Sequence, residues 1–395
     1  MSSAERRAGV SLAVVFAFRM FGLFLILPVF SVHAQTIPGG DNTIYVGLAI
    51  GAYGITQAFL QIAFGVASDR FGRKPVILFG LVLYVLGSAV AALAGDIYTV
   101  IVGRALQGAG AISAAVTALA VDLTREQHRT KVMAMIGSSI GLVFALSMVA
   151  APVLYAVIGM AGIFWLTAAL ALGAMALVGW VVPAAPKTPV AAHGAGGTLA
   201  DILRDKSLMK LNFGVFVLHL IQMMMWVTVP AAIVARGGLA LPEHWKVYLP
   251  AVLLSFAVMI PVVIAAERGG RLKQALSGAV ALLAFVQVGL HLMAGNVWLF
   301  GVWLTLFFVA FNILEATQPS LISRLAPPRI KGTALGVYST LQSAGLFIGG
   351  SAGGWLAQHF GEIAVGIACA MLALAWLVVT CTLSLPVREA HVPDN

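Results

Sequence analysis

The stretch Gly65-Val66-Ala67-Ser68-Asp69-Arg70-Phe71-Gly72-Arg73-Lys74 lies between two apolar runs and is too short for a long loop. One apolar helix must therefore end near Ser68 and the next must begin at Pro75. Asp69 suits a helix N-terminus, and the basic residues favour the cytoplasmic side of a membrane. The stretch predicts a tight turn between two helices at a membrane surface.

The composition is that of a membrane protein, because 61% of the 395 residues are hydrophobic and 9% are charged. Soluble domains carry about 25% charged residues, so a water-soluble globule is excluded. The formal charge of +9 comes from Lys and Arg in short gaps between apolar runs, which argues against nucleic acid as a partner. The sequence has no Walker loop, no H-E-x-x-H pattern and no nucleophile elbow. We expect no enzyme activity, no cofactor and no metal.

Twelve apolar runs are long enough, at about 20 residues each, to span the core of a bilayer. The sequence therefore predicts an all-α integral membrane protein with 12 transmembrane helices. The expected spans are 9–33, 44–68, 75–95, 97–122, 131–155, 161–183, 210–235, 246–266, 272–294, 297–323, 332–357 and 361–385.

One long polar segment, 184–209, falls midway along the chain. We expect it to be a linker between two six-helix bundles, residues 1–183 and residues 210–395, the second of which ends in a short tail. Within the linker, three apolar residues at helical spacing predict a short surface helix over 198–204.

The two halves also repeat one another in sequence. Ser68-Asp69-Arg70-Phe71-Gly72-Arg73 has a counterpart 198 residues later in Ala266-Glu267-Arg268-Gly269-Gly270-Arg271. Arg129-Thr130-Lys131-Val132-Met133-Ala134 recurs 200 residues later as Arg329-Ile330-Lys331-Gly332-Thr333-Ala334. Two matches at nearly one offset predict that the two bundles are pseudo-symmetric.

The positions of Lys and Arg set the expected orientation, because short cytoplasmic loops carry an excess of these residues. If both termini are cytoplasmic, 19 of the 23 Lys and Arg residues lie on that side. Only Arg236 and Lys246 then lie in the outer loops, and Arg19 and Arg104 lie within spans. We therefore expect a multi-pass protein whose termini and linker are cytoplasmic.

An ionisable side chain within a span costs about 2.5–3.5 kcal/mol and so needs a partner or a purpose. Glu315 is the only acid well inside a span, and Asn312 and Gln318 on either side predict a polar helix face toward a water-filled cavity. Desolvation favours the neutral carboxyl, so Glu315 is the main candidate for carrying a coupling proton. The alternative is a structural salt bridge to an arginine.

The remaining ionisable groups in spans are Arg19, Arg104, His219 and His291. His219 is the reserve candidate for proton coupling, with packing as the alternative, whereas we expect His291 to be a packing residue. Arg104 or Arg19 would lie near Glu315 and tune its proton affinity.

Polar and aromatic side chains at helical spacing predict a largely apolar substrate cavity with scattered hydrogen-bonding groups. The candidates are Tyr53, Gln57, Gln107, Phe144, Met148, Gln222, Trp226, Phe311, Asn312, Tyr338 and Gln342. For most of the Met and Phe residues, taken singly, the alternative is ordinary core or lipid-facing packing.

Two motifs carry a family resemblance. The stretch around Asp69 has the form G-x-x-x-D-R-x-G-R-[KR], and Arg104-Ala105-Leu106-Gln107-Gly108 has the form R-x-x-Q-G. With twelve spans and a central linker, they resemble the major facilitator superfamily of secondary transporters over essentially the whole chain. Gly54-Ile55-Thr56-Gln57-Ala58 and His244-Trp245-Lys246-Val247 are similar to the YajR-type branch of its proton-linked drug antiporters. The soluble C-terminal domain of that branch is not expected in the ten residues after the last span.

The resemblance implies a conformational switch at the cytoplasmic surface, formed by Asp69, Arg70, Gly72, Arg73 and Asp122. Asp69 would cap the N-terminus of the eleventh span in the other half, and Arg73 would pair with Asp122. The resemblance also implies a monomer in a bacterial inner membrane, with a small-molecule substrate, protons and membrane lipid as partners.

Three functions remain open at this point. The first is proton-coupled export of small amphipathic compounds or drugs by alternating access. The second is proton-coupled uptake, or facilitated diffusion, of a small nutrient, and the third is a membrane sensor without a substrate. Antiporters of this family carry a Gly-Pro motif in the fifth span, where this chain has Ala150-Ala151-Pro152. Antiport is therefore favoured by the resemblance as a whole but not by this motif.

Overall fold

The computed structural model describes residues 1–183, 199–293, 295–327 and 331–383, and every regular element within them is helical. The first half contains α1 (Ser3–Ala34), α2 (Thr43–Phe71), α3 (Arg73–Ala92), α4 (Ile97–Ala109), α5 (Ser113–Asp122), α6 (Glu126–Ala176) and the π-helical turn η1 (Leu177–Val181). The second contains α7 (Leu199–Arg204), α8 (Lys206–Ala235), η2 (Leu241–Glu243), α9 (Trp245–Arg268), α10 (Leu272–Val288), η3 (Gly289–Met293), α11 (Val297–Leu325) and α12 (Lys331–Cys381). The predicted all-α class is confirmed. The helix predicted over 198–204 is present as α7, and the rest of the linker up to residue 198 lies outside the described residues.

Ten helical segments of the described chain are long and apolar enough to cross a membrane, and two of them cross twice. The helices α6 and α12 contain 51 residues each, about 77 Å of straight helix, whereas a bilayer core is about 30 Å thick. Each reverses at a glycine with positive φ, Gly159 at 65° and Gly361 at 80°, a conformation that glycine adopts without strain. The helices α4 and α5 share one crossing. The result is twelve crossings, as predicted.

Several backbone features recur in both halves at the offset of the sequence repeat. Gly72 and Gly270 both have positive φ, 94° and 65°. Asp96 and Asn296 both cap a helix by accepting a hydrogen bond from the N–H three residues later. The bond from the Thr99 N–H also lowers the pKa of the Asp96 carboxyl. Together with the reversals in α6 and α12, these matches place equivalent turns in the two halves.

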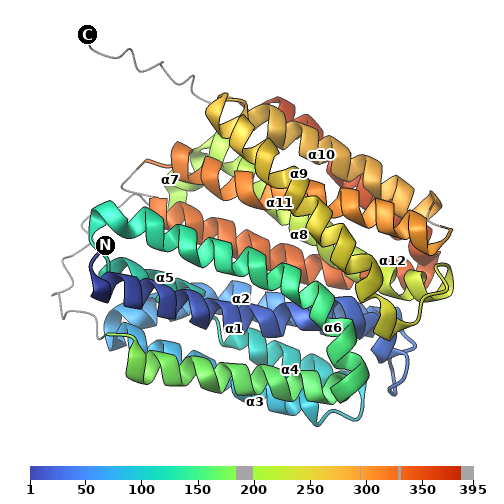
Figure 1. Ribbon diagram of the computed structural model, residues 1–395, viewed down its shortest axis with the longest axis horizontal. Coiled ribbons are helices and arrows are strands. Elements are labelled where there is room, and N and C mark those ends of the chain that lie inside the picture. The colour runs from blue at the N-terminus through green and yellow to red at the C-terminus, as the bar shows by residue number, and fades with distance from the viewer. Residues whose placement is uncertain (184–198, 294, 328–330, 384–395) are drawn as a thin grey trace.

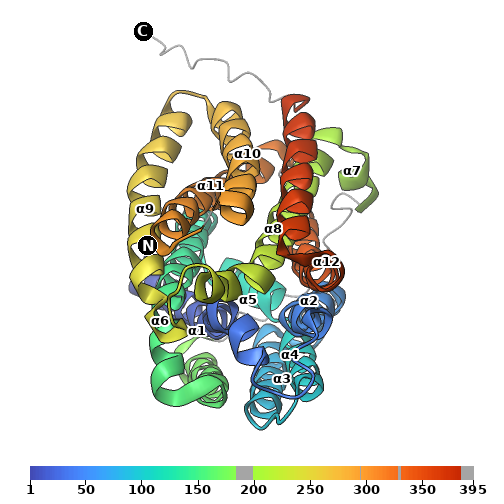
Figure 2. The ribbon, with the colours of Figure 1, turned by 90° about the vertical axis from the view of Figure 1, so that its right-hand side faces the viewer.

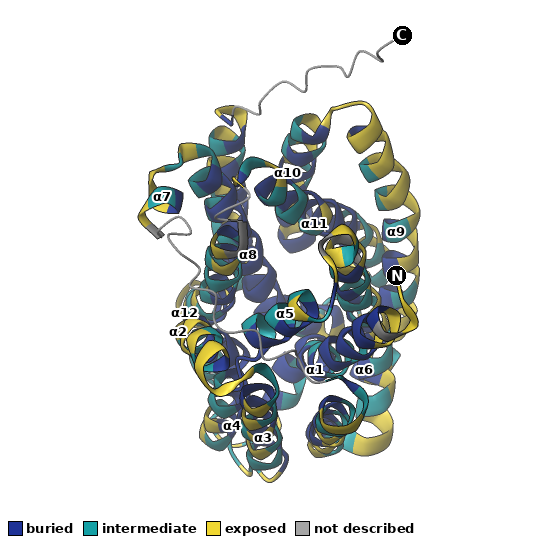
Figure 3. Cartoon of the chain, turned by 90° about the vertical axis from the view of Figure 1, so that its left-hand side faces the viewer, coloured by how far each residue is buried: buried dark blue, intermediate teal, exposed yellow. Residues whose placement is uncertain are grey.

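The helices α1 to α6 form one layer and α8 to α12 the other, as seen from the side in Figure 1 and end-on in Figure 2. We call the end at which α1 and α8 begin the terminal end, and the end with the α1–α2 connection the distal end. Large apolar side chains are exposed on the outside, among them Phe59 (74%), Trp180 (86%) and Val378 (67%), whereas the faces between helices are buried (Figure 3). Such an outer surface suits contact with lipid.

Hydrogen bonds and close backbone packing between α2 and α12 join the two layers toward the distal end. Thr43 Oγ1 donates to the Gly354 carbonyl at 2.9 Å, and the Thr43 N–H donates to Gln358 Oε1 at 2.8 Å. One turn further along α2, a Cβ added to Gly47 would lie 2.0 Å from the carbonyl oxygen of Gly350. Only glycine allows two helix backbones to approach this closely. We call this contact the glycine seam.

The seam does not continue to the terminal end. A Cβ added to Gly65 of α2 would meet only Ala114 of its own layer, at 3.7 Å. Added Cβ atoms on Gly137 of α6 and Gly336 of α12 would meet nothing within 4 Å. Between described residues, all hydrogen bonds that join the two layers involve Thr43. The structure therefore has its two halves closed against each other at the distal end.

Candidate functional site

Glu315 of α11, His219 of α8 and Gln342 of α12 meet midway through the second layer. Glu315 Oε1 lies 3.2 Å from His219 Nε2, and Gln342 Nε2 lies 2.7 Å from the same ring nitrogen. On the other side of the ring, Nδ1 lies 3.0 Å from the carbonyl oxygen of Val215, one turn earlier in α8. If the ring N–H is directed at that carbonyl, a neutral imidazole keeps its lone pair on Nε2.

The contact between Glu315 and His219 can accommodate one proton. Glu315 Oε1 is buried and accepts no hydrogen bond from the described residues, because its contact with His219 is close but is not aligned as a hydrogen bond. A buried carboxylate oxygen that faces an imidazole lone pair is unfavourable. A proton on either group would provide the missing donor.

Of the three polar residues predicted to share a water-facing side of α11, only Glu315 is partly exposed. Its side chain is 32% exposed, whereas that of His219 is 5% exposed. Asn312 is directed toward α9, where its Nδ2 donates to Ser255 Oγ at 3.0 Å. Gln318 is fully buried, and neither of its polar atoms has a partner among the described residues. The predicted polar face is therefore wrong for Asn312 and Gln318.

An aromatic cluster joins the two layers beside the Glu315–His219 pair. Phe144 of α6 stacks on Phe311 of α11 with ring centroids 5.6 Å apart, and it meets Phe308 edge-on at 5.9 Å. The ring of His219 lies edge-on to Phe311 at 6.1 Å. Met148, one turn beyond Phe144, is fully buried. These predicted cavity residues do come together, but they form packed contacts rather than an open chamber.

A second polar network lies within the first layer, around Arg19 and Arg104, each of which is 1% exposed. The central carbons of the two guanidinium groups lie over the ring of Tyr53, 5.6 Å and 5.3 Å from its centroid, in cation–π contact. Neither group forms an ion pair with a described carboxylate, so the structure places neither beside Glu315, contrary to our expectation. Their charges are instead held by hydrogen bonds of Arg19 to Ser113 and Gln57, and of Arg104 to Gln107 and to two backbone carbonyls.

The other predicted cavity residues are buried in helix packing. Trp226 is fully buried and meets Tyr248 edge-on at 6.1 Å. Gln222 is 3% exposed, and Tyr338 is 5% exposed, with a hydroxyl that has no partner among the described residues. In the described part of the chain, no group of three or more His, Cys, Asp or Glu residues is placed to hold a metal ion.

The turn between α2 and α3 consists of Gly72 alone, so it is even tighter than predicted. Arg73 Nη1 lies 2.5 Å from Asp69 Oδ1, and Arg73 Nε donates to Asp122 Oδ2 at 3.0 Å. The predicted contact of Arg73 with Asp122 is therefore present. The cap that Asp69 would form on the eleventh span lies next to residues 328–330, which are outside the described ones, and it stays a prediction.

Comparison with known proteins gives a match at the family level. The model of the Major Facilitator Superfamily matches residues 12–349. The chain is 45% identical over 389 residues to the inner membrane transport protein YajR of Escherichia coli (strain K12), covering 98% of this chain and 85% of that protein. It is 27% identical over 347 residues to the multidrug resistance protein MdtH of Proteus mirabilis (strain HI4320), covering 85% and 84%. Among solved structures, a D-xylose-proton symporter has a similar fold, with a TM-score of 0.75 at 14% identity, covering 95% of this chain and 98% of that one.

Proposed function

The chain belongs to the major facilitator superfamily, and on that premise we propose that this membrane transporter exports small amphipathic compounds in exchange for protons. The observation that carries the proposal is the pair of Glu315 and His219, whose facing atoms lie 3.2 Å apart within the membrane. The name of the MdtH relative, a multidrug resistance protein, favours export of such compounds.

In the proposed cycle, Glu315 is either protonated or engaged with substrate, but not both. In this cycle, Glu315 exchanges its proton with the terminal side while the two halves are closed at the distal end. Substrate enters from that side as the proton leaves, and the halves then open at the distal end. There the substrate is released and a proton returns to the pair. This exclusive occupancy is what couples the two fluxes.

Uptake in symport with protons is the second candidate, because the pair would bind a proton equally well in that mode. The two are separated in inverted membrane vesicles with an acidic interior and a pH-sensitive dye, challenged with a panel of amphipathic compounds. Antiport makes the interior more alkaline when substrate is added outside, because protons leave as substrate enters. Symport makes it more acidic, and facilitated diffusion leaves the pH unchanged. Acidification of the interior, or an unchanged pH with every compound in the panel, would contradict the proposal.

Arg73→Gln is expected to slow transport about fivefold while the protein remains folded. Arg73 holds carboxylates from α2 and α5 together at the terminal end. Partly exposed pairs contribute about 1 kcal/mol, too little to unfold the protein. If the contact exists in only one of two conformations, the same energy changes their ratio several-fold. The control is Lys246→Gln, which breaks the exposed pair with Glu243 and should leave transport unchanged. Equal loss in both variants would contradict a switch at Arg73.

We further propose that the terminal end is cytoplasmic, because the Lys and Arg excess lies there. In a variant without Cys369 and Cys381, single cysteines are placed at Ser3 and at Gly95. A Cβ on Gly95 would meet nothing within 4 Å, so the new thiol is accessible. An impermeant maleimide should label only the Gly95→Cys protein in intact cells. Labelling of Ser3→Cys would reverse the orientation.

A further inference from the structure

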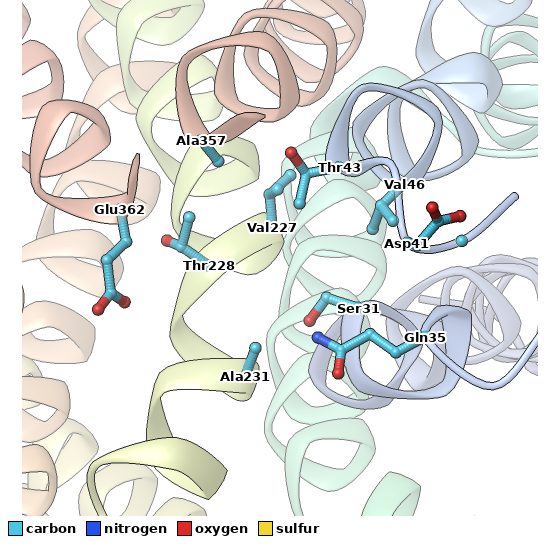
Figure 4. Close-up of a pocket in the computed structure, with 11 residues that line it drawn as sticks. Ser31, Gln35, Asp41, Thr43, Val46, Val227, Thr228, Ala231, Ala357 and Glu362 are labelled. Carbon is cyan, nitrogen blue, oxygen red and sulfur yellow. The ribbon is translucent and has the colours of Figure 1, made fainter. Parts of the chain in front are cut away.

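A cavity of about 430 Å³ lies at the distal end, between the two layers (Figure 4). Its volume falls within the range of small-molecule sites, about 300–1,000 Å³. None of the residues of the Glu315–His219 pair or of the aromatic cluster lines it. The lining residues from the first layer are Ser31, Gln35, Gly40, Asp41, Thr43 and Val46, and those from the second are Val227, Thr228, Ala231, Ala357 and Glu362.

The hydroxyl of Ser31 indicates that this cavity takes a ligand. Hydroxyls inside helices commonly donate to the carbonyl one turn back, as Ser88 and Thr380 do here at 2.7 Å and 2.9 Å. Ser31 lies in α1, is 3% exposed and lines the cavity, yet it makes no hydrogen bond to the described residues. A buried hydroxyl without a partner is unfavourable. A ligand with a hydrogen-bonding group would satisfy it.

The two carboxylates that line the cavity favour a ligand with two positively charged groups. Asp41 and Glu362 lie on opposite sides of it, with the apolar side chains of Val46 and Val227 between them (Figure 4). Asp41 is exposed and forms no ion pair with a described residue. Glu362 Oε2 lies 3.3 Å from Arg236 Nη2, and this contact leaves its Oε1 available. An anion would face two carboxylates, and a compact cation would reach only one.

The other charged residues at the distal end also favour a cation as the ligand. The distal connections carry four carboxylates, Asp41, Asp96, Glu243 and Glu362, against two cations, Arg236 and Lys246, although the chain as a whole has a formal charge of +9. A cleft with an excess of one charge raises the local concentration of ions of the opposite sign.

We propose that the distal cavity binds a linear alkyl diamine, with one ammonium group at Asp41 and the other at Glu362. The alkyl chain lies over Val46 and Val227, and Ser31 accepts a hydrogen bond from the ammonium group on the Asp41 side. Because the lining comes from both layers, the bound diamine holds the distal end closed and slows the cycle. The site is separate from the proton-binding pair and does not rest on proton coupling.

The test measures binding of 1,5-diaminopentane to the purified protein in lipid nanodiscs by titration calorimetry, without substrate or gradient. We expect saturable binding that weakens at least tenfold with 1-aminopentane, which lacks one charge. We expect a similar loss in Asp41→Asn and in Glu362→Gln, because each removes a charge-assisted hydrogen bond. Glu243→Gln, at the same end but outside the cavity, is the matched control and should bind normally. Asp41 is exposed, so Asp41→Asn keeps the test valid if Glu362→Gln does not fold.

Spin labels at Gly95 and Gly295, where an added Cβ meets nothing within 4 Å, report on the distal end across the two layers. We expect 1,5-diaminopentane to increase the population with the shorter distance. The same titration in Glu315→Gln separates this site from proton coupling, because binding there should be unchanged. Equal binding of the monoamine, unchanged binding in Asp41→Asn or the absence of saturable binding would each overturn the proposal.

Discussion

Glu315→Gln is expected to reduce proton-driven transport about 100-fold or more, since positioned proton-transfer groups contribute about 10²–10⁴-fold. Gln resembles the protonated carboxyl in shape and charge, so the protein should remain folded, and substrate binding should weaken because a protonated Glu315 does not engage substrate. The carboxyl group, whose buried Oε1 lacks a hydrogen-bond donor in the described structure, is replaced by an amide, and an amide cannot release a proton. The measurement is the pH-dye signal in inverted vesicles, together with binding of the same panel compound to the purified variant.

The matched control for this variant is Glu267→Gln, which removes another carboxylate of the second layer. Glu267 forms an exposed pair with Arg324, at 2.9 Å, and exposed pairs contribute about 0–1 kcal/mol. Its loss should change neither folding nor the dye signal by more than a few-fold. If Glu315→Gln retains full proton-driven transport while folded, the coupling site lies elsewhere, and His219 alone becomes the candidate.

Gly47→Ala is expected to hold the transporter open at the distal end and to reduce transport about 100-fold. The new Cβ would lie 2.0 Å from the carbonyl oxygen of Gly350, and because this atom is backbone it cannot rotate away. Overpacking of this kind costs about 1–3 kcal/mol, which changes the ratio of two conformations by up to about 150-fold. The cost falls only on the distal-closed state, so the distance between labels at Gly95 and Gly295 should lengthen.

Gly301→Ala is the control for the glycine seam, because it makes the same change in a long helix, α11, away from both the seam and the motif around Asp69. Its Cβ would meet nothing within 4 Å. We expect normal transport and an unchanged label distance in this variant. A Gly47→Ala protein that closes and transports like the wild type would show that the seam is not the distal gate.

The features that the sequence predicts well are those that the membrane imposes on it. Lipid requires apolar runs of about 20 residues, so the sequence predicts the twelve crossings. It also predicts two separate spans within each of the long helices that reverse at Gly159 and Gly361. The Arg73–Asp122 contact, which is present, is implied by the family resemblance that the motif around Asp69 carries, and not by the residues themselves.

The site was less predictable, because its contacts join residues that are far apart in the chain. The sequence marks Glu315 and His219 as candidates, but nothing in the 95 residues between them shows that they touch. Arg19 was expected near an acid, whereas its partner Ser113 lies 94 residues away and a serine carries no distinctive signal. The glycine seam did have a signal, since Gly350 and Gly354 are four residues apart in a small-xxx-small pattern. The pattern predicts close helix packing, but not the partner helix.

The central claim, that the Glu315–His219 pair binds the transported proton, is tested most directly by infrared difference spectroscopy of the protein in lipid as pH is changed through neutrality. The carbonyl band of a protonated carboxyl reports on each carboxyl that titrates, and no substrate is needed. We predict a band that appears on acidification in the wild type and in Glu267→Gln, is shifted in His219→Gln, and is absent in Glu315→Gln. An identical band in the wild type and in Glu315→Gln would contradict the account.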